Sequence, residues 1–176
     1  GATNTSFIHD MNRNTSSADK TEIGDCEIYR KVCVFKWWLY CDAKLNSMGC
    51  YPAIAAFGDP SATAGSGFTV TCSNVIGQKF GLLFYGLNGT ASQPFQGGTL
   101  CVQSPVQRTP VQFSGGTPFG CDGQFAIDMN AFATSAPANP ALSLPGSIVD
   151  CQWWSRDPGS PSMTSLSDAL EYFIDL

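Results

Sequence analysis

The chain has 176 residues, of which 43% are hydrophobic and only 13% are charged, and its formal net charge is −5. A chain of this length is expected to form one domain with a substantial core. The negative charge argues against nucleic acid as a partner, because the few scattered Lys and Arg form no basic stripe to neutralise phosphates. No membrane span is expected either, since the sequence contains no run of about 18 apolar residues.

Residues 1–22 differ from the rest of the chain. They are rich in Ser, Thr and Asn, lack cysteine, and hold one small apolar group, Phe7, Ile8 and Met11. Two interpretations are open: a disordered leader, or an arm that becomes ordered against a neighbouring subunit. The first residues, GATNTSF, are expected to follow a signal-peptide cleavage site, which fits secretion.

The remainder of the chain, residues 23–176, has a β pattern, because short segments are rich in β-branched and aromatic residues. These segments are 26–41, 53–58, 67–75, 79–87, 98–103, 106–113, 123–130, 147–157 and 168–176. Turns rich in Gly and Pro separate them, and residues 129–142 are expected to hold one short helical turn. We therefore predict an all-β fold, a disulfide-stabilised antiparallel β-sandwich or jelly roll, with an extended N-terminal arm over residues 1–22.

The cysteines indicate disulfide bonds rather than a zinc site. There are eight, none in a CxxC pair, and the single histidine, His9, lies in the polar arm. Zinc sites draw on clustered Cys and His, whereas dispersed cysteines in even number are typical of a secreted protein in an oxidising compartment. Eight cysteines allow about 105 connectivities, so only the first pair is favoured by proximity alone. The expected pairs are Cys41–Cys50, Cys101–Cys121, Cys72–Cys151 and Cys26–Cys33.

Several longer motifs occur over residues 40–174. They are YCDAKLNSMGCYPAI, GLLFYG, PFQGGTLCV, QRTP, CDGQFAIDMNAF and CQWWSRDP followed by SLSDALEY. On these motifs the chain resembles a module at the C-terminal end of many secreted proteins of planctomycete- and myxobacteria-like bacteria. The module has no established activity, so the resemblance implies a surface or structural setting. The chain departs from it at FIDL, where relatives often carry a final cysteine, and in residues 1–39, which have no counterpart.

Catalytic chemistry is not expected. A nucleophilic triad needs a base beside its nucleophile, and His9 is isolated. Paired carboxylates are the remaining option for acid–base work, although solvated or turn-capping carboxylates explain the same residues. The candidates are Asp150, Asp157, Asp168 and Glu171.

No metal or cofactor is expected. Asp122, Asp128 and Asn130 lack the dense spacing of a calcium loop. The RDP motif is expected to close a strand, with Arg156 paired to a carboxylate and Pro158 forcing the turn.

The four tryptophans occur as two doublets, Trp37–Trp38 and Trp153–Trp154. Neighbouring side chains of a strand point to opposite faces, so the two members of a doublet cannot share one side. Trp153 alternates with Cys151 and is predicted in the core, whereas Trp154 falls on the polar face. The strand around Trp37 is apolar on both faces, so its second face must be covered by an arm, a neighbouring subunit or a ligand.

Three functions fit these features. The favoured one is a structural subunit of an extracellular assembly, such as a filament, pilus-like fibre or surface layer, whose partner is another copy of the chain. The alternative is a secreted carbohydrate-binding or adhesion module that holds a surface polysaccharide on Trp38 or Trp154. The third is a stabilising terminal domain that covers its tryptophans with its own loops. Interface or glycan candidates are Phe7, Ile8, Met11, Trp38 and Trp154, and glycosylation candidates are Asn4, Asn14 and Asn88.

Overall fold

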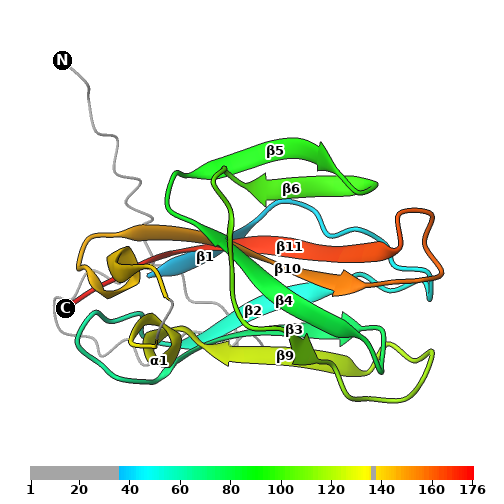
Figure 1. Ribbon diagram of the computed structural model, residues 1–176, viewed down its shortest axis with the longest axis horizontal. Coiled ribbons are helices and arrows are strands. Elements are labelled where there is room, and N and C mark those ends of the chain that lie inside the picture. Colours follow the sequence, from blue (N-terminus) through cyan, green and yellow to red (C-terminus); the bar gives the residue numbers. More distant parts are fainter. Residues whose placement is uncertain (1–35, 136–137) are drawn as a thin grey trace, which may run out of the picture. The chain divides into compact units, whose positions relative to one another are not determined.

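The computed structural model describes residues 36–135 and 138–176. These residues belong to one compact unit, Phe35–Leu176. Two antiparallel sheets enclose a common apolar core, and a separate two-stranded hairpin lies on the other side of the larger sheet (Figure 1). The predicted all-β fold with disulfide bonds is therefore confirmed.

The larger sheet has six strands and the smaller sheet has three. The order in the larger sheet is β1 (Trp37–Tyr40), β11 (Thr164–Phe173), β10 (Ile148–Arg156), β4 (Phe80–Gly86) and β7 (Gln107–Arg108), and β8 (Gln112–Phe113) also pairs with β4. The smaller sheet contains β2 (Ala53–Gly58), β3 (Phe68–Val75) and β9 (Gly123–Asp128). The hairpin contains β5 (Thr90–Phe95) and β6 (Gly98–Val102). All pairings between these strands are antiparallel.

Two departures from the predicted strands have simple causes. The segment 106–113 divides into β7 and β8, and Pro110 stands between them, where it cannot donate to a strand ladder. Residues 90–95 were expected to be a turn but form β5. Their polar side chains and Pro94 hide the strand pattern, because this hairpin strand is mostly exposed and does not alternate.

The short helical turn expected within residues 129–142 is present as two pieces. The helix α1 (Met129–Ala133) begins at Asp128, whose carboxylate accepts a hydrogen bond from the Ala131 amide. The 3-10 helix η1 (Pro140–Ser143) begins at Asn139, whose side chain accepts from the Ala141 amide. Both caps satisfy an amide that the helix itself leaves free.

Trp153 lies in the core, as its alternation with Cys151 predicts. It is 1% exposed and stacks on Phe125 of the smaller sheet, with ring centroids 5.2 Å apart. Val149 and Cys151, at the same parity of β10, belong to the same core cluster. The inner face of the larger sheet is thus apolar along this strand.

The opposite face of β10 is also buried, although its residues are polar. Asp150 and Gln152 are fully buried there. Gln152 Nε2 donates to Thr99 O of the hairpin at 3.0 Å, and its Oε1 accepts from the Cys101 amide at 3.1 Å. The hairpin therefore covers this outer face through side-chain hydrogen bonds to its backbone, in place of a strand ladder.

Trp154 is covered by the same hairpin. Its indole Nε1 donates to Gln96 Oε1 at 2.8 Å, and its ring packs near Phe84 at 6.4 Å. Phe95 of β5 completes this aromatic group, 6.1 Å from Phe84. The second tryptophan of the doublet is thus shielded by the chain's own loop region.

Two disulfide bonds join distant parts of the described chain. Cys41 pairs with Cys101, and Cys50 pairs with Cys121. The predicted pairs Cys41–Cys50 and Cys101–Cys121 are therefore wrong. The reason is Asn46, which closes the turn without a disulfide: its Oδ1 accepts from the Met48 and Cys50 amides at 3.0 Å each. Cys41 is then free to bind β6, and Cys50 to bind the loop before β9.

The predicted pair Cys72–Cys151 is also wrong, since both cysteines are free thiols. They sit on β3 and β10, at inward positions of the two sheets, and both are buried in the core cluster. Burial raises the pKa of both thiols. Each behaves as a small apolar core residue, which is common for free cysteine.

Several predictions lie outside the described residues. They concern the arm and its boundary at residue 22, the pair Cys26–Cys33, His9, the apolar group Phe7, Ile8 and Met11, and the sequons at Asn4 and Asn14.

Candidate functional site

The loop from Cys41 to Pro52 is fixed to the sandwich at several points. Lys44 Nζ donates to Gln96 O at 2.9 Å, to Ser160 Oγ at 3.0 Å and to Thr164 O at 2.6 Å, and it also contacts Ser162 Oγ. These acceptors come from the hairpin turn and from the turn between β10 and β11. The three protons of one ammonium group are shared among these four acceptors. Lys44 thus ties its own loop to the hairpin and to the connection between β10 and β11.

Asp157, a candidate catalytic carboxylate, is a structural residue. It is fully buried, and its Oδ2 accepts from the Ser47 amide at 2.8 Å. Its Oδ1 accepts from the Ser47 hydroxyl. The RDP motif and the loop motif therefore meet here, and both carboxylate oxygens hold the loop.

The fixed loop forms one wall of an open groove of about 560 Å³. Residues 41–43 and 51–53 line it together with Asp168. Tyr51 is 58% exposed, and Asp42 is also exposed. Asp168 Oδ1 accepts from the Ile54 amide at 2.7 Å, and burial raises the pKa of this carboxyl group. The groove thus offers an aromatic ring and two acids on a rigid frame, and it contains no lysine or arginine among its lining residues.

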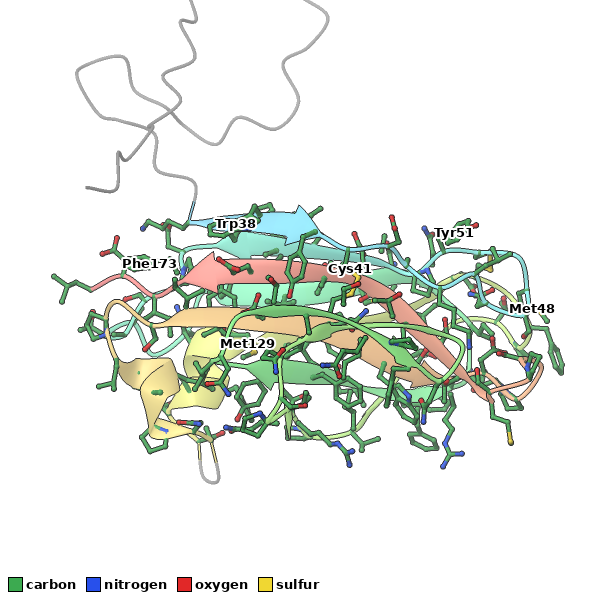
Figure 2. The ribbon with its side chains drawn as sticks, turned by 90° about the horizontal axis from the view of Figure 1, so that it is seen from above. Trp38, Cys41, Met48, Tyr51, Met129 and Phe173 are labelled. Carbon is green, nitrogen blue, oxygen red and sulfur yellow. A yellow bond between two sulfur atoms is a disulfide. The ribbon has the colours of Figure 1, made fainter. Side chains whose placement is uncertain are left out.

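A second exposed feature is β1, which among the described residues is the edge strand of the larger sheet, together with the sheet face beside it. Trp38 is 45% exposed and Leu39 is 49% exposed. Trp38 is opposite Glu171 of β11, and the exposed Phe173 of the same strand is opposite the exposed Ile148 of β10. We call Trp38, Leu39, Phe173 and Ile148 the apolar edge. Trp38 and Phe173 lie toward one end of the strands, and Tyr51 lies toward the other (Figure 2).

Two candidate carboxyl groups, Asp150 and Glu171, come together next to this edge. They are direct partners in the ladder between β10 and β11. Tyr40 of β1 lies beside them, with its hydroxyl 2.9 Å from Asp150 Oδ1 and 2.8 Å from Cys101 O. Burial, and then the charge of Asp150, raises the pKa of Glu171 to about 7. Asp150 is completely covered, so a substrate in solution does not reach it in this conformation.

The remaining predicted polar residues have local partners. Asp122 accepts from Thr117, which lowers the pKa of its carboxyl group. Asp128 accepts from the Gly67 amide in addition to capping α1, and Asn130 binds the 59–66 loop. Within residues 36–135 and 138–176, no three His, Cys, Asp or Glu side chains gather closely enough to hold a metal ion.

Arg156 was predicted to pair with a carboxylate, but it contacts an aromatic ring instead. Its guanidinium lies 6.0 Å above the Trp154 ring, and the salt bridges of the described residues involve Lys36 instead, with Asp59 and Asp175. The aromatic face of Trp154 is the nearer partner because the strand places both residues on one side, two positions apart. Asn88 is exposed in a turn, and its side chain donates to Ser104 O at 3.1 Å.

The sequence did not single out Tyr51, Phe173, Ile148 and Tyr40 as candidate site residues. Tyr51 had a usable signal, since it stands between a cysteine and a proline in a constrained loop. The other three had none, because their positions depend on which strands become neighbours.

No protein-family model, no curated protein and no solved structure matches this chain. The helices of the described residues are all too short or too polar to cross a membrane.

Proposed function

We propose that the chain is a structural subunit of an extracellular assembly, in which copies associate through the apolar edge around β1. The single observation that carries this proposal is the composition of β1. Its four residues, WWLY, contain no charge and no proline, whereas edge strands are normally guarded by charged residues, proline or bulges against pairing with another chain.

The surroundings of β1 support the same function. Lys36, directly before the strand, forms salt bridges with Asp59 at 3.1 Å and Asp175 at 3.3 Å. Because these carboxylates neutralise its charge, Lys36 does not protect the edge of β1 against pairing with another chain. Among the described residues, β1 pairs with β11 only. On the face that carries Trp38, Phe173 and Ile148 add exposed apolar side chains on two further strands, whereas Leu39 belongs to the other face. Exposed apolar side chains gathered at one sheet edge favour a protein contact.

The two disulfide bonds and the resemblance to a secreted module fit an extracellular location. Disulfide bonds persist in oxidising environments, and they protect a subunit that must last outside the cell. In this proposal the polar arm, residues 1–22, contributes Phe7, Ile8 and Met11 to the contact with the next copy.

The double variant Trp38→Ser/Leu39→Lys is expected to convert the assembled protein into a monomer of 18.7 kDa. Serine removes apolar contact area, and the lysine places a charge where a second strand would pair. Sedimentation velocity and negative-stain microscopy of the full chain measure the outcome.

Phe57→Ser is the matched control. Phe57 is 63% exposed on β2, in the smaller sheet, and its replacement should leave the particles intact. Deletion of residues 1–22 tests the arm separately. A wild-type chain that stays monomeric at high concentration would contradict the proposal.

A second candidate function is carbohydrate binding in the groove beside Tyr51. The observation that favours it is the exposed ring next to the two acids, since sugar sites combine an aromatic surface with a few fixed polar groups. The platforms expected from the sequence were Trp38 and Trp154: the hairpin shields Trp154, and Trp38 is exposed but lies on β1, outside the groove. Asp42 and the free oxygen of Asp168 would accept hydroxyl protons of a neutral sugar.

Tyr51→Ala is expected to weaken retention on a neutral polysaccharide by at least about tenfold, the equivalent of about 1.4 kcal/mol. Affinity electrophoresis in gels that contain the polysaccharide measures this change. Phe57→Ala should retain full binding, since its ring is equally exposed but outside the groove. Absence of retention for the parent chain on every neutral polysaccharide tried would remove this candidate.

A further inference from the structure

The cluster of Tyr40, Asp150 and Glu171 lies between three strands and the hairpin that covers them. Tyr40 comes from β1, Asp150 from β10 and Glu171 from β11, and the Cys101 carbonyl comes from β6. Cys101 is also bonded to Cys41, directly after β1. The cluster is therefore the place where the edge strand, the sheet and the hairpin meet.

The hydrogen bonds of this cluster lack one proton. The Tyr40 hydroxyl has a single proton but lies within hydrogen-bond distance of two acceptors, Cys101 O and Asp150 Oδ1. Asp150 Oδ2 is buried and has no donor among the described residues. Glu171 stands directly opposite Asp150, so a proton on Glu171 would supply the donor that Oδ2 needs.

We propose that Asp150 and Glu171 form a proton-operated latch. While the pair holds a proton, Glu171 donates to Asp150, and Tyr40 is free to donate to the Cys101 carbonyl and hold the hairpin against the sheet. When the proton leaves, two negative charges face each other. Tyr40 must then donate to Asp150, the Cys101 carbonyl loses its partner, and the hairpin and β1 loosen.

The surrounding groups leave the charge of the pair uncompensated. Tyr40 from β1 is the titratable group that faces the pair. The Cys151 thiol is next to Asp150 in β10 but lies on the core side of the sheet, where burial and the charge of Asp150 raise its pKa. β4 places Gly86 opposite Asp150, and β6 contributes Cys101, which is bonded in a disulfide. In the described part of the chain the salt bridges are those of Lys36 with Asp59 and Asp175, so no cation neutralises the latch.

The direction of the pH dependence follows from the raised pKa of Glu171. Burial, and then the charge of Asp150, raises it from 4.5 to about 7. A carboxyl group with a raised pKa stabilises the closed state fully below its ordinary pKa, and this stabilisation is lost as the pH rises to the raised value. The latch is therefore closed at acidic pH and released near pH 7.

The test is amide hydrogen exchange of the full chain between pH 4.5 and 8, followed by NMR and corrected for the intrinsic exchange rate. Protection at Cys101 and Val102 should fall by up to about tenfold per pH unit below pH 7. The total fall should be about 10–30-fold, because Glu171 is partly exposed and solvent screens its charge. Protection in β3 of the smaller sheet should stay constant.

Glu171→Gln supplies the donor at every pH, so its β6 protection should not depend on pH. Asp150→Asn should reduce the slope, because it removes the charge of Asp150 but leaves the burial of Glu171, and it keeps the test decisive where the first variant fails to fold. Asp168→Asn is the matched control: it removes another partly buried carboxyl group of β11 with a raised pKa and should leave the wild-type slope. A flat wild-type profile, or a slope that persists in Glu171→Gln, would overturn the latch.

Discussion

Trp153→Ala is expected to lower the free energy of unfolding by about 3–5 kcal/mol. Trp153 is 1% exposed and stacks on Phe125 at 5.2 Å, so alanine would leave a cavity between the two sheets. Val149 and Cys151, its neighbours in the same core cluster, are buried and cannot move far to fill it. Urea unfolding followed by far-ultraviolet circular dichroism measures the change.

Trp153→Phe is the informative control for this core position. Phenylalanine keeps an aromatic ring against Phe125, and it removes the indole Nε1, which is buried without an acceptor among the described residues. Removing an unsatisfied buried donor offsets part of the free-energy cost of the lost side-chain volume. We therefore expect the free energy of unfolding to fall by about 1–2 kcal/mol. A cost for alanine no larger than that for phenylalanine would contradict the assignment of this residue to the core.

The tryptophan doublet shows what the sequence predicts well and where it stops. Alternation along a strand depends on local geometry alone, so it places Trp153 in the core correctly. What covers Trp154 depends on Gln96, 58 positions earlier in the chain. Polar residues of β5 gave no sign that this hairpin would lie over the sheet. The covering of Trp154 by the hairpin could therefore be found only from the structure.

The disulfide prediction failed for a related reason. Proximity along the chain favoured Cys41–Cys50, but Asn46 closes that turn: its Oδ1 accepts from the Met48 and Cys50 amides, and its backbone amide donates to Cys50 O. Because the turn needs no disulfide bond, Cys41 and Cys50 pair with cysteines 60 and 71 positions away in the sequence. A sequence without an alignment contains no signal for such partners.

The four carboxyl groups considered for acid–base work are in different surroundings, and these differences are visible only in the folded chain. Asp157 holds Ser47, Asp168 lies in the groove, and Asp150 is buried against Glu171. The last pair depends on the register between β10 and β11, since a shift of one residue would turn Glu171 to the other face. Register is set by packing across the whole sheet, which short motifs do not encode.

Cys50→Ala/Cys121→Ala is expected to lower the free energy of unfolding by about 4 kcal/mol, the second large effect. The bond closes a loop with a sequence separation of 71 residues, and the chain-entropy model gives about 4 kcal/mol for a loop of that length. Replacing both cysteines avoids leaving a reactive thiol. Urea unfolding under non-reducing conditions, compared with the wild type, measures the effect.

This variant also separates the proposed carbohydrate groove from the proposed latch. Cys50 directly precedes Tyr51, so loss of its bond should loosen the groove and weaken any carbohydrate retention. The latch lies at the other disulfide, and its pH-dependent protection at Cys101 should persist. Cys41→Ala/Cys101→Ala has a similar separation of 60 residues and should cost a similar free energy, but it should open the hairpin at every pH. Cys41 also lines the groove, so the hairpin protection is the measurement that distinguishes the two variants. If the two double variants changed the protection of the hairpin alike, the disulfides would stabilise the fold only globally, and the hairpin would not depend on its own bond.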